Sequence, residues 1–398
     1  MKPPASSPKL DLAVRVGARM KPVLAASLLV LLFSGAAEAD GYQDFNLGLV
    51  SRNRQDWDAT VKLMTLALSE PDLPPHLKVV AYFDRGTSYL GEKQFDAAIA
   101  DFTTVIQLKP DYIEAYSARA SAFAAKTQFA KAIDDITKAI SLRPVYRPTY
   151  YQRIAIYTAT KNMEAAIADC TTLIKMSPNE AMLYRLRGTT YRRNGNYDLA
   201  IADEGTALAI NDQVAVDFRE RGFDYAAKGD FSNAVDDFNS EIRLSVDLTL
   251  PYMRKGAVQW DWGKFADAES SFEHALKIQP QQKYGFLWLA ITRGKTSTAI
   301  DSDMSQRFSA SDLTKWPGPL VALFLGKATA GDVDSAAKRA DAASQIGEIC
   351  EAQFFIAEWQ QIHQLAATRK FQEIAQTCAD DAVIRPAAIA ESNRPVAP

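Results

Sequence analysis

Apolar residues recur through the middle of the chain with the spacing of short amphipathic helices that come in pairs. Tyr82, Gly86 and Tyr89 stand at i, i+4 and i+7, so they share one face of a helix. Phe95 and Ala98 begin the same kind of face in a second segment, after a polar turn. A proline follows the second segment in most units and ends it, because proline cannot extend a helix. The pattern therefore predicts a helical hairpin as the structural unit.

This hairpin repeats with a period of 34 residues. One position holds alanine in every copy: Ala98, Ala132, Ala166, Ala200, Ala234 and Ala268. A second position holds an aromatic residue: Tyr82, Tyr116, Tyr150, Tyr184, Phe218 and Tyr252. A third holds a large apolar residue: Phe95, Phe129, Met163, Tyr197, Phe231 and Phe265. Such a period indicates hairpins that stack into a solenoid, since each hairpin needs neighbours to cover its apolar faces.

The order of aromatic, glycine, alanine and proline positions resembles the tetratricopeptide-repeat family over residues 41–280. The resemblance implies an all-α, right-handed α-solenoid whose first helices line a concave groove, closed by an irregular helical C-terminal cap. The expected organisation is a signal peptide at 1–39, a degenerate first repeat at 40–78, six repeats at 79–280, an atypical helical cap at 281–380, and a short helix with a disordered tail at 381–398. The cap region also resembles the C-terminal part of small periplasmic repeat proteins of Gram-negative bacteria.

The first 39 residues have the pattern of a secretory signal peptide. Basic residues precede an apolar run at 23–33, and an A-x-A motif ends at Ala39, after which cleavage is expected. Met20 is an alternative start that leaves a complete signal peptide. The other interpretation, an uncleaved anchor, is disfavoured because the apolar run is shorter than the ~20 residues that span a bilayer. We expect a periplasmic or secreted protein without stable membrane insertion.

Charge and motifs exclude several classes of function. Removing residues 1–39 changes the formal net charge from −3 to −6, and this acidic balance argues against nucleic-acid binding. The three histidines are far apart in the sequence, and no motif for zinc binding or phosphate binding is present. We therefore expect no catalytic residues, no metal and no cofactor, and a hydrolase hidden in residues 281–398 is disfavoured.

The three cysteines divide into two kinds. Cys170 occupies an apolar position of its repeat and is expected to be buried as a free thiol. Cys350 begins one predicted helix and Cys378 ends the next, so an antiparallel hairpin would bring them together. We expect a Cys350–Cys378 disulfide in an exported protein, although the helical register could instead keep the two sulfur atoms apart.

A second set of positions pairs arginine with aspartate. The arginines are Arg85, Arg119, Arg153, Arg187 and Arg221, and the aspartates are Asp101, Asp135, Asp169, Asp203 and Asp237. The sixth repeat loses both, with Lys255 and Ser271 in their places. The recurrence predicts a ladder of ion pairs, either within each repeat or between neighbours. A row of arginines that awaits an acidic ligand is the less favoured interpretation.

The later repeats place arginine and aromatic residues at the groove positions that the resemblance implies. The candidate partner-binding residues are Arg185, Thr189, Arg192, Arg219, Phe223, Met253, Arg254 and Trp260. Arginine and large aromatic residues are enriched in binding hot spots. The alternative is that Arg192 only solvates a helix end and that Trp260 packs inward, replacing the tyrosine missing at Gln259.

The sequence as a whole favours an exported, non-enzymatic scaffold that binds a protein or peptide partner in its groove. The alternative is a dedicated accessory subunit of an envelope enzyme or secretion complex. An adaptor would purify as a stable monomer or weak dimer, whereas a dedicated subunit would expose a large apolar patch. The sequence assigns neither the partner nor the oligomeric state.

Overall fold

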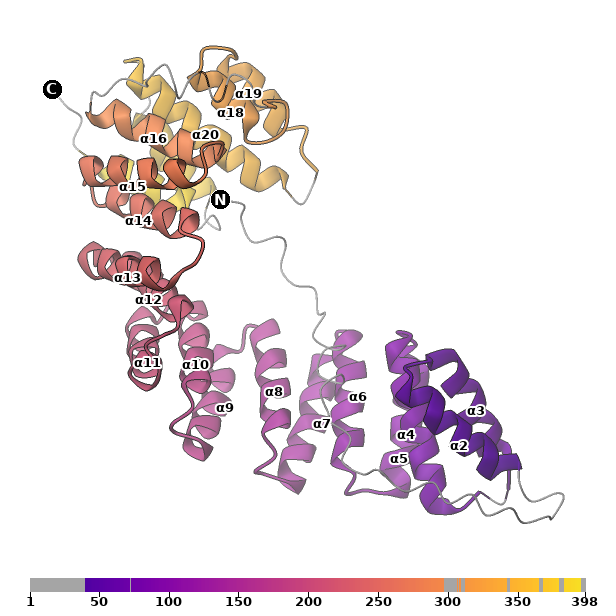
Figure 1. Ribbon diagram of the computed structural model, residues 1–398. Helices are drawn as coiled ribbons and strands as arrows, with labels where there is room; N and C mark the ends of the chain where they lie inside the picture. Colours follow the sequence, from indigo (N-terminus) through magenta and orange to yellow (C-terminus); the bar gives the residue numbers. More distant parts are fainter. Residues whose placement is uncertain are drawn as a thin grey trace. The chain divides into compact units, whose positions relative to one another are not determined.

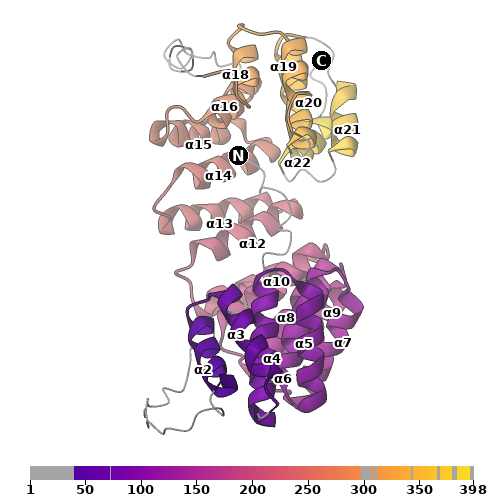
Figure 2. The ribbon, with the colours of Figure 1, turned by 90° about the vertical axis from the view of Figure 1, so that its right-hand side faces the viewer.

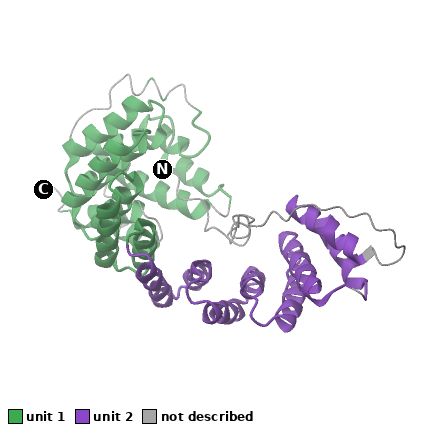
Figure 3. Ribbon diagram, turned by 60° about the horizontal axis from the view of Figure 1, so that its bottom comes forward, with its two compact units in different colours: residues 1–7, 179–398 green, residues 8–178 purple. Residues whose placement is uncertain are grey.

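The computed structural model describes residues 40–71, 73–296, 306, 308, 312–341, 344–364, 368–378 and 383–394, and every regular element within them is a helix (Figure 1). The predicted all-α repeat solenoid is confirmed. The helices form two compact units that divide between Pro178 and Asn179 (Figure 3). Residues 1–39, the predicted signal peptide, lie outside the described residues. None of the described helices has the length and apolar character needed to cross a membrane.

The N-terminal unit consists of helix pairs in which each helix packs against the next (Figure 2). Its helices are α2 (Asp40–Asn53), α3 (Trp57–Ser69), α4 (Pro75–Gly91), α5 (Phe95–Leu108), α6 (Ile113–Ala125), α7 (Phe129–Leu142), α8 (Arg147–Ala159) and α9 (Met163–Met176). The first pair, α2 and α3, covers one side of α4 and extends the stack beyond the clearest repeats.

The C-terminal unit continues the pairs and adds a less regular group of helices. The pairs are α10 (Ala181–Arg193) with α11 (Tyr197–Ile210), α12 (Ala215–Ala227) with α13 (Phe231–Leu244), and α14 (Thr249–Asp261) with α15 (Phe265–Ile278). The irregular group is α16 (Lys283–Thr296), α18 (Gly318–Phe324), α19 (Ala330–Ala337), α20 (Gln345–Ile362), α21 (Thr368–Thr377) and α22 (Ile384–Asn393).

The turn inside each pair uses one residue in the left-handed backbone region. In the N-terminal unit these residues are Gln55, Lys93, Thr127 and Lys161, with φ of 59–63°, and in the C-terminal unit they are Gly195, Gly229 and Gly263, with φ of 77–78°. Glycine adopts this conformation at little cost, whereas other residues are strained by it. The same turn closes every pair, which maintains the register of the repeat.

Small residues allow the two helices of a pair to approach closely. A Cβ atom added at Gly86 would lie 2.9 Å from the ring of Phe102, and one at Gly256 would lie 2.7 Å from the ring of Phe272. Real Cβ atoms do not approach this closely, so any larger residue would push the helices apart. The small positions of the sequence pattern are therefore packing positions.

The arginine–aspartate ladder runs within each repeat. In all five repeats the arginine Nε and Nη2 donate to the two oxygens of the aspartate 16 residues later, at 2.7–2.8 Å. Arg119 also donates to Thr103 Oγ1 of the preceding repeat at 2.9 Å. In the sixth repeat, Ser271 donates to Gln259 at 2.6 Å instead. The paired arginines are satisfied, so they are structural.

Aromatic side chains of the last repeat and the cap form one buried cluster. Trp260, Trp288 and Phe354 contact one another with ring centroids 5.5–5.9 Å apart. Cys350 and Cys378 form a disulfide with a Cα–Cα distance of 5.8 Å, which joins the start of α20 to the residue after α21. Cys170 is a buried thiol that takes no part in the disulfide.

Loss of this disulfide is expected to destabilise the cap. Closing a loop of 28 residues restricts the unfolded chain, and removing such a bond typically costs about 3 kcal/mol. Urea denaturation of Cys350→Ala/Cys378→Ala should show this loss. Wild-type protein in reducing agent is the matched control and should unfold at the same urea concentration as the variant. Unchanged unfolding on reduction would contradict the expectation.

The tail following the cap differs from the prediction. The short helix expected here is α22. Residues 391–398 were expected to be disordered, yet α22 extends to Asn393 and Arg394 packs on Trp260. Residues 395–398 lie outside the described residues. Glu391 is only 3% exposed. The polar composition of this segment suggested disorder. Composition alone does not reveal that Glu391 and Arg394 have partners in the cap and the last repeat.

Candidate functional site

The candidate groove residues lie on the first helices α10, α12 and α14, and two of them are buried. Met253 is 1% exposed and Trp260 is fully buried in the cluster of the last repeat and the cap. The prediction that these two side chains line an exposed groove is therefore wrong. Trp260 packs inward, as the alternative interpretation held, because the cap helices cover its face of α14.

The four candidate arginines are all engaged in ion pairs. Arg185 pairs with Asp217 at 2.8 Å, Arg219 with Glu220 at 3.0 Å, and Arg254 with Glu241 at 2.7 Å. Arg192 has several partners and does not merely solvate the end of its helix, which corrects that interpretation. Thr189 is half-buried, and Phe223 is 38% exposed.

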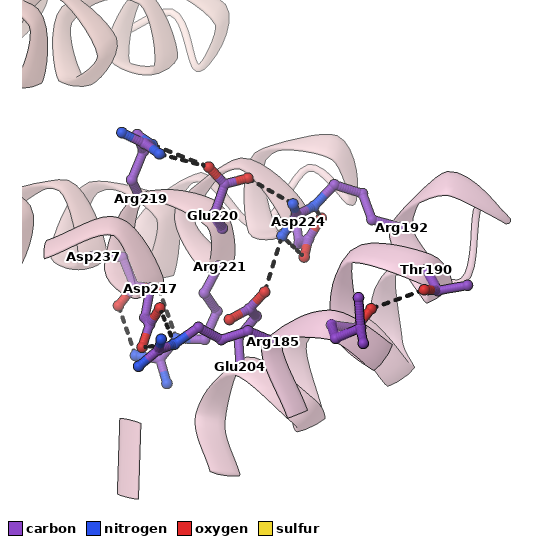
Figure 4. Close-up of polar contacts among 11 residues, drawn as sticks. Arg185, Thr190, Arg192, Glu204, Asp217, Arg219, Glu220, Arg221, Asp224 and Asp237 are labelled. Atoms are coloured by element: carbon purple, nitrogen blue, oxygen red, sulfur yellow. Dashed lines mark hydrogen bonds and ion pairs between the residues drawn. The ribbon is translucent and has the colours of Figure 1, made fainter. Parts of the chain in front are cut away.

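Figure 4 shows that the ion pairs between α10, α11 and α12 form a connected network. Arg192 donates to both oxygens of Asp224 at 2.5 and 2.9 Å and to Glu220 at 2.6 Å. Glu220 also accepts from Arg219 at 3.1 Å. The Nη2 of Arg192 lies 3.4 Å from an oxygen of Glu204, a long contact. Glu220 thus connects the arginines of two successive repeats.

Three carboxylates that pair with the candidate arginines occupy positions that are mostly apolar or small in the other repeats. Glu204 stands where other repeats have Phe102, Ile136, Cys170, Phe238 and Phe272. Asp224 stands where they have Ser88, Ala122, Ile156, Thr190 and Val258, and Glu241 where they have Val105, Ala139, Leu173, Ala207 and Ala275. Each of these three acids is at most 3% exposed. Sequence reasoning missed them, although aligning the repeats by their period reveals acids at core positions.

Burial dominates the electrostatics of these acids. It raises the pKa of Glu204 to about 8, against the opposing effect of Arg192. Burial also raises the pKa of Asp217 and of Asp224, although each accepts hydrogen bonds from an arginine. One oxygen of Glu204 and one of Glu241 have no hydrogen-bond partner. A buried charge without a full set of partners is costly, so the arginines are needed to hold these carboxylates.

Two of the candidate arginines retain hydrogen-bonding capacity. Arg185 uses only its Nε toward Asp217, and its Nη1 and Nη2 have no acceptor within the part of the chain that the structure describes. Arg219 uses Nε and Nη2 toward Glu220, and its Nη1 likewise has no described acceptor. Their side chains are 29% and 31% exposed. A guanidinium with unused donors can bind a carboxylate from another molecule.

Exposed apolar side chains share the helix face of these two arginines. Met182, Arg185 and Thr189 stand at i, i+3 and i+7 of α10, and Val216, Arg219 and Phe223 have the same spacing in α12. Met182 is 51% exposed and Val216 is 37% exposed. We call these six residues the arginine-bearing face. It can provide charge-assisted hydrogen bonds beside apolar contact area.

The residues that the structure describes contain no cluster suited to a metal ion. No group of three histidine, cysteine, aspartate or glutamate side chains is placed to hold a metal ion there. The acids of the network are instead held by arginines.

The fold defines a solenoid of paired helices, and comparisons with known proteins identify its family. Two family models, both described as tetratricopeptide repeat, match residues 83–146 and 251–282. With the fold, these matches show that the chain is a tetratricopeptide-repeat protein. No curated protein matches it.

Several solved structures are similar to this chain. The C-terminal part of a TPR repeat-containing protein from Cytophaga hutchinsonii is 15% identical, with a TM-score of 0.54, covering 62% of this chain and 99% of that one. A tetratricopeptide repeat protein from Parabacteroides merdae is 16% identical, with a TM-score of 0.44, covering 64% and 98%. At these identities the likeness concerns the fold alone, and only the first score is high enough to support it.

Proposed function

We propose that this chain is a non-enzymatic scaffold that binds a protein or peptide partner on the arginine-bearing face of α10 and α12. The observation that carries the proposal is the pair of partly exposed guanidinium groups with unused donors on successive repeats. Proteins with tetratricopeptide repeats generally act by binding other proteins, and this supports a scaffold over an enzyme.

The face also indicates the chemistry of the partner. Arg185 and Arg219 occupy the same position of successive repeats, each beside an exposed apolar side chain. An extended segment that carries acidic groups among apolar side chains would satisfy both the donors and the apolar area. Arginine and aromatic contacts commonly dominate the energy of such interfaces.

We further propose that the protein works outside the cytoplasm, in the periplasm or after secretion, following cleavage after Ala39. The pattern of residues 1–39 supports export. The Cys350–Cys378 disulfide also supports it, because disulfides persist mainly in oxidising compartments.

The variant Arg219→Glu/Phe223→Ala is expected to weaken partner binding at least tenfold. Both side chains are partly exposed, and the ion pair of Arg219 is with the half-buried Glu220. Burial raises the pKa of Glu241 and the charge of Arg219 opposes that rise, so the circular dichroism spectrum must show that the variant keeps its fold. Charge reversal at Arg185 is avoided because it would put a second carboxylate beside the buried Asp217. Partners captured by residues 40–398 from an envelope extract would be identified by mass spectrometry, and their affinity measured by calorimetry.

Arg193→Glu is the matched control, since Arg193 is an exposed neighbour on α10 outside the arginine-bearing face. It should leave the affinity unchanged. Equal capture by the double variant, with an unchanged circular dichroism spectrum, would refute the face as the binding site. A single stoichiometric complex that withstands all of these changes would favour a dedicated subunit of an envelope complex.

A further inference from the structure

The first helix of the last repeat differs from the others at the site where Trp260 stands. The same position holds Leu90, Ala124, Thr158, Arg192 and Ala226 in the other repeats. Trp260 is the largest of these side chains, and it is fully buried. Trp288 and Phe354 of the cap contact its ring edge to face. Phe265 and Lys295 also lie against the ring, and Arg394 of the C-terminal segment, residues 383–394, covers one of its faces.

The guanidinium of Arg394 stacks on the ring of Trp260. The guanidinium carbon lies 4.3 Å from the centroid of the Trp260 ring and 4.6 Å from that of Phe265. The same guanidinium donates to the carbonyl oxygen of Trp260. A cation over an aromatic face is attracted by the ring's quadrupole, most strongly for tryptophan and when water is excluded. The contact combines stacking with a directed hydrogen bond.

Charged groups around Trp260 complement this arginine. One carboxylate oxygen of Asp261 is buried without a hydrogen-bond partner, and Glu358 is fully buried. Lys295 lies 3.0 Å from Glu358 and 2.7 Å from Glu391 of the C-terminal segment. The segment therefore enters a site with acidic side chains from α14 and α20 and one lysine from α16. Such a site favours a cationic group and accepts one carboxylate beside it.

The segment itself is a short helix that depends on its surroundings. α22 has ten residues, and it contacts α14, α20 and α21. An isolated helix of this length is marginal in water. Its order comes from the surfaces that it covers, in particular the contacts of Glu391 with Lys295 and of Arg394 with Trp260.

We propose that the Trp260 face of α14 is a second binding surface, selective for an arginine at the end of a short helix, and that the chain's own segment 383–394 occupies it. A partner with the same chemistry, an arginine that follows an amphipathic helical turn and has a carboxylate three residues earlier, would compete with the segment. Binding at this surface is therefore coupled to release of α22. The proposal is separate from the arginine-bearing face, which lies on α10 and α12.

The test is binding of a fluorescent peptide of residues 383–398 to two forms of the protein. A form that ends at residue 382 should bind the peptide saturably, and the form with residues 40–398 should bind it at least tenfold more weakly. The peptide with Arg394→Ala should bind the shortened form at least tenfold more weakly than the unchanged peptide. A shortened form that stays helical by circular dichroism but binds neither peptide, or binds both equally, would overturn the proposal.

A second variant keeps the test decisive if the shortened form does not fold. Arg394→Ala in the chain of residues 40–398 should loosen the segment and strengthen binding of the unchanged peptide at least tenfold. Unchanged peptide binding in this variant would count against the proposal. Arg219→Glu/Phe223→Ala should leave peptide binding unaffected, so failure of the proposed scaffold function and failure of this inference can be told apart.

Discussion

Replacing Arg192 with leucine is expected to lower the free energy of unfolding by about 3–5 kcal/mol, as removal of one partner of a buried ion pair usually does. Asp224 is fully buried, and Arg192 donates to both of its oxygens. Without the guanidinium, the carboxylate must remain charged and unpaired or take up a proton. Urea denaturation followed by circular dichroism measures the loss.

Sibling repeats supply both the control and the rescue for this experiment. Leu90 and Val258 occupy the positions of Arg192 and Asp224 in other repeats. The double variant Arg192→Leu/Asp224→Val removes both charges and should recover much of the lost stability. Arg193→Leu, at an exposed position of the same helix, should change stability by less than ~0.5 kcal/mol. If Arg192→Leu lowers the free energy of unfolding by less than about 1 kcal/mol, the ion pair of Arg192 with Asp224 does not hold the fold together.

Stability is also expected to fall as the pH rises from the acidic to the mildly basic range. The pKa of Glu204 is raised by burial from an ordinary value of 4.5 to about 8. A carboxyl with a raised pKa stabilises the folded state while it is protonated, and this contribution disappears as the pH rises through the folded pKa. For Glu204 the change amounts to about 4 kcal/mol between pH 4.5 and pH 8.

Glu204→Gln tests this expectation, because glutamine retains the shape and hydrogen-bonding groups but does not titrate. Denaturation across the same pH range should show a shallower decline in the variant than in wild type. The pKa of Asp217 and that of Asp224 are also raised, so part of the decline should remain. Glu164→Gln, at an exposed glutamate of α9, is the matched control. Equal slopes for wild type and Glu204→Gln would contradict the prediction.

Much of the fold could be predicted because each repeat makes mainly local contacts. The small residues at the positions of Ala98 and Gly86 let the two helices of a hairpin approach closely, so their recurrence indicates the hairpin directly. The pairing of Arg85 with Asp101 followed from the same period. Its register did not, because both arrangements are compatible with stacked helices of this length.

The candidate site was predicted less well. Trp260 has the composition of a hot-spot residue, but whether it is exposed depends on the cap, whose helices are irregular and follow no period. Glu204 is the opposite case, since its position in the repeat already indicated a buried acid. The arginines were found by their residue type, yet their partners come from the next repeat or from neighbouring helices.

The amino-acid sequence determined the paired helices, their period and the close packing within each pair, because these depend on residues near one another in the chain. The tertiary structure decided which charged side chains are buried, which donors of Arg185 and Arg219 remain unused, and which segment covers Trp260. These features arise between helices that are distant in sequence. Their energies depend on how completely each charged or aromatic group is removed from water, which the local pattern of residues does not specify.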